Sequence, residues 1–585
     1  MKSLLASAIA VFLCAVFTQN QTAPVAPKPG SAVELPPVKS LDSTVVALPK
    51  GDPSVKGVAI CFTAAHCPIA TAQLPALVAL ARQYSEQGVR FYFVDPNVKE
   101  TTADLKELEA RVHGAGPLIH DTEQLWTRAL KVSRTTEALV IDGSGVLRYR
   151  GAFDDQFALG TRKPEPQRHY VKEALVAVLA GKAPALPETE PKGCLITPAA
   201  RPAAPVPPSG EVHYHEHVAP VLRKHCVECH RPGEIGPLPL LSYDDADAAA
   251  AMIAEVVEQR RMPPWHANPQ FGSWKNARGL SEEERSTLIR WASGARSEGP
   301  KPAKPADPAP AAPLWHIGAP DLVLTIPKQR IPATGKIDYH YVEVPTGLTE
   351  DRWVTAAEVH AGAREVVHHA LIFVVYPKDR RHEQPPIDGG LNGGFFASLV
   401  PGERPNEWPA GTGKLLPAGS ALLFQMHYTA DGTAREDATQ IGLVFAKEPP
   451  ARRVVNRGIH QRKLNIPPGA SAARFEARWK VSRDVEILAF LPHMHYRGKS
   501  FRYVLEHPDG REETLLDVPR YDFGWQATYI PEKPLQVSGG STMRCIAEFD
   551  NSAANLANPN PKATVRWGEQ SWDEMMIGYV DYVEK

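Results

Sequence analysis

Histidines are concentrated in a few short stretches of the C-terminal half, and their spacing is suited to binding a metal ion. His493 and His495 flank one residue at the end of 485–490, a run that reads as a strand. On an extended segment, residues i and i+2 lie on one face, so a single ion can contact both imidazoles. An H-x-H pair alone is a weak signal. Three further stretches strengthen the metal-site prediction: 366–369, 424–428 and 572–576.

Together these stretches resemble the copper type II, ascorbate-dependent monooxygenases, the family of peptidylglycine alpha-hydroxylating monooxygenase and dopamine beta-monooxygenase. The resemblance covers about residues 315–585 and implies two all-β antiparallel, jelly-roll-like sandwiches, 315–455 and 456–585. It implies two copper ions per chain. The copper that relays an electron would be bound by His368, His369 and His427. The copper that binds dioxygen would have the catalytic ligands His493, His495 and Met575.

The ligand chemistry supports this assignment independently of the resemblance. Imidazoles without a carboxylate suit copper or zinc, and a thioether favours reduced copper. Met543 and Met576 remain competitors of Met575 for the thioether role. His368 and His369 are adjacent, so on a regular strand they would point to opposite faces. If both bind one ion, the chain must twist or bulge there.

A second motif, C-x-x-C-H at Cys226, Cys229 and His230, is the attachment signature of c-type haem. Both thiols bind the haem covalently and the histidine binds the iron. A zinc half-site is the poorer interpretation, because there is no second cysteine pair. The helical patterns at 218–225 and 246–261, with a capping box at 281–284, resemble small all-α cytochrome c domains, here 211–299. Met262 is the preferred second iron ligand, with His266 as the alternative.

Residues 40–183 alternate strand and helix patterns and resemble an α/β thioredoxin or peroxiredoxin-type domain, with Cys67 at the position of the reactive cysteine. A helix N-terminus there would stabilise the thiolate. The domain has no C-x-x-C, and Thr136 stands at the cis-proline position, so an inert thiol is the alternative. Cys194 is the best candidate for a redox partner, whereas Cys61 reads as buried packing.

The whole chain, 585 residues with a net charge of −1, is long enough for three or four domains and argues against nucleic acid as a partner. Residues 1–23 read as a secretory signal peptide, and no later apolar run is long enough for stable membrane insertion. With the haem motif, this predicts a periplasmic or secreted bacterial protein. Three Pro-rich linkers are expected: 24–39, 184–210 and 300–314.

The resemblance implies hydroxylation of a C–H bond of a small-molecule or peptide substrate by dioxygen. The electrons would come from the fused haem or from an external donor. Of the residues that hold the peptide in one relative, the tyrosine is retained as Tyr579 but the arginine is replaced by Leu491, which puts a glycine-extended peptide in doubt. Two other classes stay open: a haem and copper electron-transfer or copper-handling protein, and a scaffold in which the thioredoxin-like domain recognises a partner.

Overall fold

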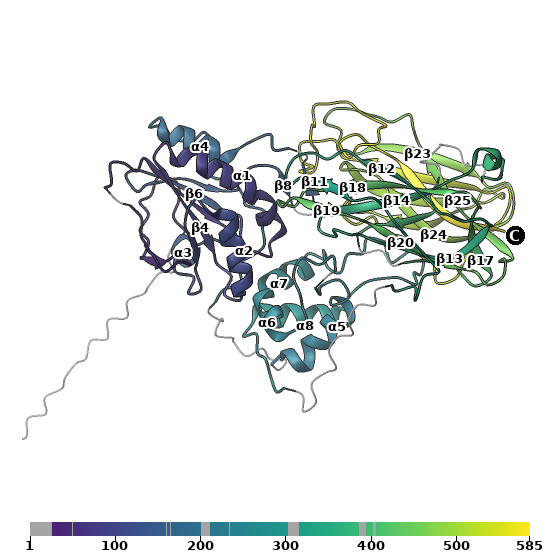
Figure 1. Ribbon diagram of the computed structural model, residues 1–585, viewed down its shortest axis with the longest axis horizontal. Helices are drawn as coiled ribbons and strands as arrows, with labels where there is room; N and C mark the ends of the chain where they lie inside the picture. Colours follow the sequence, from purple (N-terminus) through teal and green to yellow (C-terminus); the bar gives the residue numbers. More distant parts are fainter. Residues whose placement is uncertain are drawn as a thin grey trace, which may run out of the picture.

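The computed structural model describes residues 26–49, 51–158, 161–163, 165–199, 211–232, 234–301, 315–384, 394–401 and 405–585. These form an α/β region, a helical region and a β-rich region, seen at the left, bottom and right of Figure 1. The predicted signal peptide, 1–23, lies outside the described residues, as do 200–210 and 302–314 of the predicted linkers. Within the described ranges, no helix is long and apolar enough to cross a membrane.

The α/β region is built on a five-stranded sheet in the order β5-β4-β3-β6-β7. β4 is parallel to β3 and β5, and β6 is antiparallel to β3 and β7. The strands are β3 (Gly57–Phe62), β4 (Val89–Asp95), β5 (Leu118–His120), β6 (Ala138–Asp142) and β7 (Leu147–Gly151). The helices are α1 (Pro68–Ser85), α2 (Thr102–Val112), α3 (Leu125–Leu130) and α4 (Tyr170–Leu179). Two short hairpins complete the region: β1 (Val38–Lys39) with β2 (Val45–Val46), and β8 (Phe157–Ala158) with β9 (Thr161–Arg162).

The central strand β3 is buried along its whole length, as expected for a strand covered on both faces. Ala59 and Cys61 pack in the cluster that includes α1 and α4, whereas Val58 and Ile60 pack in the cluster that includes α3. This alternation is the period of two that strand geometry imposes. The prediction that Cys61 is a packing residue is confirmed, and burial raises the pKa of its thiol to about 12.

Two segments predicted as linkers are packed against this sheet. Val33 is buried, and Gly30 donates a backbone hydrogen bond to Leu147 of β7. In the linker predicted at 184–210, the backbone of Glu188 pairs in parallel with that of Arg150 of β7. Residues 194–197 of this linker lie beside the loop before β6. Part of the linker predicted at 24–39 is therefore paired with the sheet, because a proline-rich composition does not exclude backbone pairing with a sheet edge.

The helical region contains a π-helical turn at Tyr214–Val218 and helices α5 (Ala219–His225), α6 (Tyr243–Ala248), α7 (Ala250–Glu258) and α8 (Glu282–Ser293). Leu222, Leu288 and Trp291 are buried at its centre. The predicted capping box at Ser281 is confirmed. The single helix predicted over 246–261 is two helices, because Ala249 leaves the helical conformation at φ −93°, ψ 5°.

In the residues that the structure describes, the first half of the β-rich region has eleven strands: β10 (Leu322–Thr325), β11 (Gln329–Ile331), β12 (His340–Pro345), β13 (Arg352–His360), β14 (Val367–Val375), β15 (Ala397–Leu399), β16 (Asn406–Glu407), β17 (Thr412–Leu416), β18 (Ala421–Tyr428), β19 (Arg435–Asp437) and β20 (Gln440–Phe445). A 3-10 helix lies at Lys378–Glu383. The sheet β12-β18-β14-β15 packs against β10, β13, β17 and β20 around one apolar core. This two-layer packing agrees with the predicted sandwich.

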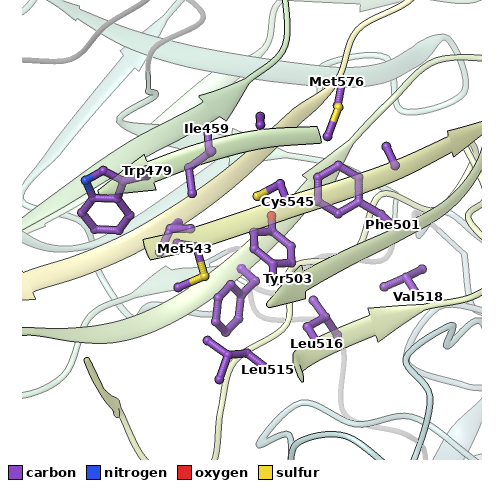
Figure 2. Packing of buried hydrophobic residues seen from close by; sticks show 14 of the residues in the cluster. Ile459, Trp479, Phe501, Tyr503, Leu515, Leu516, Val518, Met543, Cys545 and Met576 are labelled. Atoms are coloured by element: carbon purple, nitrogen blue, oxygen red, sulfur yellow. The ribbon is translucent and has the colours of Figure 1, made fainter. Parts of the chain in front are cut away.

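The second half contains β21 (Arg452–His460), β22 (Asn465–Ile466), β23 (Ala473–Lys480), β24 (Val485–His493), β25 (Gly498–Glu506), β26 (Glu512–Val518), β27 (Leu535–Val537), β28 (Thr542–Phe549), β29 (Val565–Arg566) and β30 (Ile577–Glu584). The sheet β23-β28-β25-β26 packs against β21, β24 and β30. Figure 2 shows part of this core, where Trp479, Tyr503 and Met543 lie between the strands.

The two halves share one sheet. Parallel pairing of β17 with β21 joins them into a nine-stranded sheet, whose main path is β10-β20-β13-β17-β21-β30-β24-β27. The division predicted near residue 455 therefore falls within a strand, β21, and this strand is part of the junction. Alternation patterns locate strands but carry no information about which strand of one half pairs with the other.

Candidate functional sites

The first histidine group lies where β14 and β18 pair. His369 and His427 are direct partners in the register, and a bulge lies between Val367 and His369. The predicted irregularity at the adjacent histidines is confirmed: the bulge makes His368 an extra residue, so both neighbours can turn toward His427. The structure thus brings together all three side chains predicted for the first site.

The three imidazoles have the geometry of a metal-ligand set. Nδ1 of His369 lies 3.0 Å from Nδ1 of His368 and 3.4 Å from Nδ1 of His427. One nitrogen from each ring lies within 4.8 Å of the others. Two nitrogens bound at about 2.0–2.1 Å to a tetrahedral ion are separated by roughly 3.3–3.4 Å, so these spacings fit.

Electrostatics keep this group neutral and therefore ready to bind a cation. Burial lowers the pKa of His368 to about 4. Burial also holds the pKa values of His369 and His427 well below the usual range, and the neighbouring histidines add to the effect. Around the group, Tyr339 Oη lies 3.4 Å from His369 Nε2, and Ser571 Oγ lies 3.5 Å from His427 Nε2.

The second histidine group lies at the end of β24. His493 Nδ1 is 2.6 Å from Oε1 of Gln526, and its ring centroid is 5.2 Å from that of His495. Both ring nitrogens of His495 are buried without a hydrogen-bond partner among the described residues. Since a buried polar atom without a partner is costly, such an imidazole beside His493 fits a metal ligand.

Glu574 fixes the backbone of the H-x-H segment. Its buried carboxylate accepts a 2.9 Å hydrogen bond from the N–H of His495 and a 2.6 Å bond from the N–H of Arg497. Burial raises the pKa of Glu574 to about 8, although these N–H groups and the Arg497 guanidinium oppose the shift. The residue therefore ties the segment before Met575 to the segment that carries His495.

Met575 lies two residues before β30. β24 and β30 pair with His493 opposite Ile577, and the paired stretch ends there. The competitors lie elsewhere: Met543 and Met576 are in the apolar core of the second half, as Figure 2 shows. Met575 instead packs with residues of a separate interface cluster, which includes Leu371 of the first half and Tyr579.

Tyr579 and Leu491, the two positions compared with the peptide-binding residues, are direct partners in the β24–β30 register. Tyr579 is 1% exposed, and its ring centroid lies 6.3 Å from that of His493. The tyrosine is therefore near the second group, but it is enclosed by apolar side chains rather than open to solvent.

Phe523 lies between the two histidine groups. Its ring is stacked on His368, with centroids 5.2 Å apart, and meets His495 edge-on at 5.8 Å. The second group also affects the first electrostatically, since His493 and His495 contribute to the lowered pKa values of His369 and His427. A single aromatic ring therefore contacts both predicted metal sites.

The haem motif follows α5 directly. The N–H groups of Cys229 and His230 both donate to the carbonyl of Cys226, which turns the three side chains within one tight loop. His230 Nδ1 lies 3.0 Å from the carbonyl oxygen of Leu238, the arrangement that orients a metal-binding imidazole and leaves Nε2 for the metal. The residues present therefore fit covalent haem with His230 as iron ligand.

Both candidates for the second iron ligand lie in the loop after α7. Met262 is half-buried. Both ring nitrogens of His266 are buried and lack a hydrogen-bond partner in the described part of the chain, and burial lowers its pKa to about 4. His266 therefore stays open beside the preferred Met262.

The structure places Cys194 against Cys67. Cys67 is 2% exposed and immediately precedes α1, whose first residue is Pro68. A hydrogen bond from the Cys194 thiol lowers the pKa of Cys67 to about 6, despite the opposing effect of burial, while the pKa of Cys194 is raised well above its usual value. The Cys194 backbone N–H also points to Cys67 Sγ, at 3.5 Å. The thiolate is therefore favoured at Cys67 over Cys194.

Several residues of these sites were not identified from the sequence. Gln526 and Phe523 come from a loop after β26, and nothing in their neighbours signals a site. Tyr339 precedes β12 and approaches the histidines only through strand pairing. Glu574 is the exception, because it stands beside Met575 in 572–576, one of the stretches that carry the resemblance.

Comparison with known proteins concerns mainly the α/β region. None of the curated proteins compared with the chain matches it. Solved structures with detectable similarity include a hypothetical protein from Sinorhizobium meliloti (20% identity, 30% of this chain and 94% of that chain, TM-score 0.26). An uncharacterized conserved protein from Geobacillus kaustophilus has 24% identity over 30% of this chain and 92% of its own, with a TM-score of 0.25. The thioredoxin domain of a thiol-disulfide oxidoreductase from Bacteroides vulgatus has 16% identity over 21% and 86%, with a TM-score of 0.19.

The family comparison concerns the α/β region. Residues 34–150, which run from before β1 to β7, match the AhpC/TSA family. Cys67 lies inside the matched segment, and Cys194 lies outside it. Residues 34–150 of this chain are therefore a thioredoxin-like domain of the AhpC/TSA type.

Proposed function

We propose that the chain is a periplasmic copper-dependent monooxygenase that hydroxylates a C–H bond of its substrate with dioxygen. The observation that carries this proposal is the convergence of His368, His369 and His427, with Phe523 linking them to His493 and His495. Five histidines from three strand ends meet in a buried region, and none of the proposed ligands is a carboxylate. This donor set suits copper, and Met575 adds a thioether that suits the reduced ion.

Bound copper would supply redox chemistry with dioxygen; the protein residues prepare its ligands. Gln526 accepts a hydrogen bond from Nδ1 of His493, which leaves Nε2 of that ring for a metal. Glu574 holds the H-x-H backbone, and the bulge at His368 turns two adjacent rings to one side. Burial keeps all five imidazoles neutral, as metal binding requires.

The contact between the helical and β-rich regions supports the fused haem as the electron donor. In the loop between α7 and α8, Trp265 and Trp274 pack on Tyr529, with ring centroids 5.0 and 5.6 Å away. Tyr529 exchanges backbone hydrogen bonds with Phe490 of β24, the strand that ends at His493. The loop with the iron-ligand candidates therefore packs directly on the strand of the second histidine group.

Metal analysis with oxygen uptake tests the proposal. The full chain, produced with cytochrome c maturation, should bind two coppers and consume oxygen when a periplasmic extract supplies substrate and ascorbate supplies the two electrons of each turnover. His427→Ala and His493→Ala should each remove about one copper and abolish uptake. His382→Ala, an exposed histidine outside both groups, is the matched control. Two bound coppers with reversible redox but no substrate-dependent uptake would instead favour the electron-transfer or copper-handling alternative.

A second candidate activity, thiol–disulfide exchange, is favoured by the Cys67–Cys194 contact. The Cys67 thiolate would attack a disulfide of a partner, and the Cys194 thiol would then resolve the mixed disulfide. The partner is thereby reduced to two thiols, while Cys67 and Cys194 are oxidised to a disulfide. The reduced chain should reduce an insulin-type disulfide substrate, and Cys67→Ser should lose this activity. If the wild-type chain neither reduces the substrate nor forms a Cys67–Cys194 disulfide after oxidation, the activity is contradicted.

A further inference from the structure

A cavity of about 260 Å³ lies beside the first histidine group, at the junction with the thioredoxin-like domain. Its walls include His368 and His427, the rings of Tyr496 and Trp572, and Arg162 of β9. Figure 1 places the β8–β9 hairpin where the α/β region meets the β-rich region. Arg162 donates a hydrogen bond to the carbonyl oxygen of Ala430, so the hairpin is fixed to the segment after β18. The thioredoxin-like domain thus completes a cavity whose other walls belong to the β-rich region.

The lining of this cavity is strongly cationic. Arg162, Lys163 and Lys336 contribute to it, and none of its described lining residues is acidic. Lys163 is neutralised by Asp155, 2.6 Å away. Arg162 forms no ion pair within 4 Å among the described residues, and Lys336 lies over the ring of Trp572, 3.0 Å from its centroid. Two positive charges therefore remain without a paired carboxylate at a partly enclosed, aromatic-walled space.

Burial makes this arrangement costly unless an anion completes it. Desolvation lowers the pKa of Arg162, and Tyr496, followed by the nearby Asp154 and Asp431, offsets the shift only in part. A buried guanidinium is stabilised by a charge-assisted, often bidentate, bond to a carboxylate. The faces of Tyr496, Phe523 and Trp572 offer apolar contact to a flat ligand body.

We propose that this cavity binds a small organic anion, whose charged group lies between Arg162 and Lys336 and whose body lies on the aromatic wall. The anion deepens the proposed function, since beside His368 and His427 it is either the substrate or an electron donor. Binding itself does not require copper, so the anion site is tested separately from the monooxygenase activity.

Calorimetric titration of the full-length, metal-free chain with benzoate tests the site, and benzamide serves as the neutral ligand of the same shape. Benzoate should bind, and more weakly as ionic strength rises. Arg162→Gln should weaken benzoate binding at least about tenfold, as loss of a charge-assisted hydrogen bond does. Lys336→Gln should also weaken benzoate binding. Because this variant leaves the Arg162–Ala430 hydrogen bond intact, it tests the site even if Arg162→Gln disturbs the contact between the domains. Arg162→Lys, which keeps the charge, should recover part of the affinity.

Arg168→Gln is the matched control, because Arg168 lies in the same domain, is paired with exposed Glu173 and does not line the cavity. It should leave benzoate binding unchanged. Equal affinity for benzoate and benzamide would overturn the proposal, as would absence of benzoate binding, or benzoate binding unchanged in both Arg162→Gln and Lys336→Gln.

The rate at which ascorbate reduces the copper-loaded chain under anaerobic conditions distinguishes an electron donor from a substrate. The rate is measured from the loss of the Cu(II) paramagnetic resonance signal. If benzoate and Arg162→Gln both slow the reduction, the anion is an electron donor. If the reduction rate is unaffected while benzoate binding is lost in Arg162→Gln, the anion is a substrate. A chain that takes up no copper would contradict the proposed function, and the calorimetric result would still decide the anion site.

Discussion

Gln526 Oε1 lies 2.6 Å from Nδ1 of His493, although 33 positions separate the two residues in the sequence. A glutamine carbonyl that accepts this proton selects the tautomer in which Nε2 has a free lone pair. The amide nitrogen of Gln526 is itself held by a 3.3 Å hydrogen bond to the carbonyl of Phe523, the residue whose ring contacts both histidine groups. One short loop thus orients a ligand of one group and contacts a ligand of the other.

Gln526→Leu should weaken copper binding at the second site by about 10- to 100-fold, the usual cost of losing the partner that orients a ligand imidazole. Copper at His368, His369 and His427 should remain. Competition titration with a copper chelator measures both sites. Gln536→Leu, an exposed glutamine on β27, is the control. An unchanged second-site affinity in Gln526→Leu would show that His493 is not a ligand held in this tautomer.

Met575→Ala should remove a sulfur scatterer from the X-ray absorption spectrum of the reduced, copper-loaded chain, and it should weaken reduced copper more than oxidised copper. Met543→Ala is the control. Met543 is fully buried in the core shown in Figure 2, so its truncation should cost roughly 2–5 kcal/mol of unfolding free energy and leave the sulfur signal in place. If the signal survives Met575→Ala but is lost in Met543→Ala, the ligand assignment is wrong.

The thiolate absorbance of Cys67 near 240 nm should titrate at about pH 6. Cys194→Ala should move this pKa upward, because the Cys194 thiol makes the largest stabilising contribution to the thiolate. A folded-state pKa below the unfolded value means that the unfolded chain binds more protons between about pH 6 and 9. This stabilisation is present above the unfolded pKa and is lost as the pH falls through about 6. Urea unfolding of wild type and Cys67→Ser should therefore diverge as the pH rises; parallel curves would contradict the shift.

Haem should stay attached to the chain in a denaturing gel, and Cys226→Ala with Cys229→Ala should abolish that attachment. Met262→Ala should remove a methionine-to-iron absorption band and lower the haem potential, because a thioether favours reduced iron. A spectrum that is unchanged in Met262→Ala but altered in His266→Ala would transfer the role to His266, whose ring nitrogens have no protein partner in the described residues. Covalent haem in the double variant would refute the attachment prediction.

Local patterns in the sequence were sufficient for some parts of the sites and not for others. The bulge at His368 was predictable, because two adjacent side chains can share an ion only where a strand departs from its alternation. Met575 was preferred from the stretch 572–576, and the structure places its competitors Met543 and Met576 in a different apolar cluster. Arg162 and Gln526 could not be found in this way, because they approach the histidines through domain contact and loop packing, which depend on the three-dimensional arrangement of distant segments.

The pairing of β17 with β21 has a mechanical consequence. Because hydrogen bonds continue from one half of the β-rich region into the other, a hinge between the halves would have to break strand pairing inside a sheet. The pairing therefore restrains the separation of the two histidine groups that Phe523 contacts. Under the proposed function, electron transfer between them would need no closing motion of the two halves.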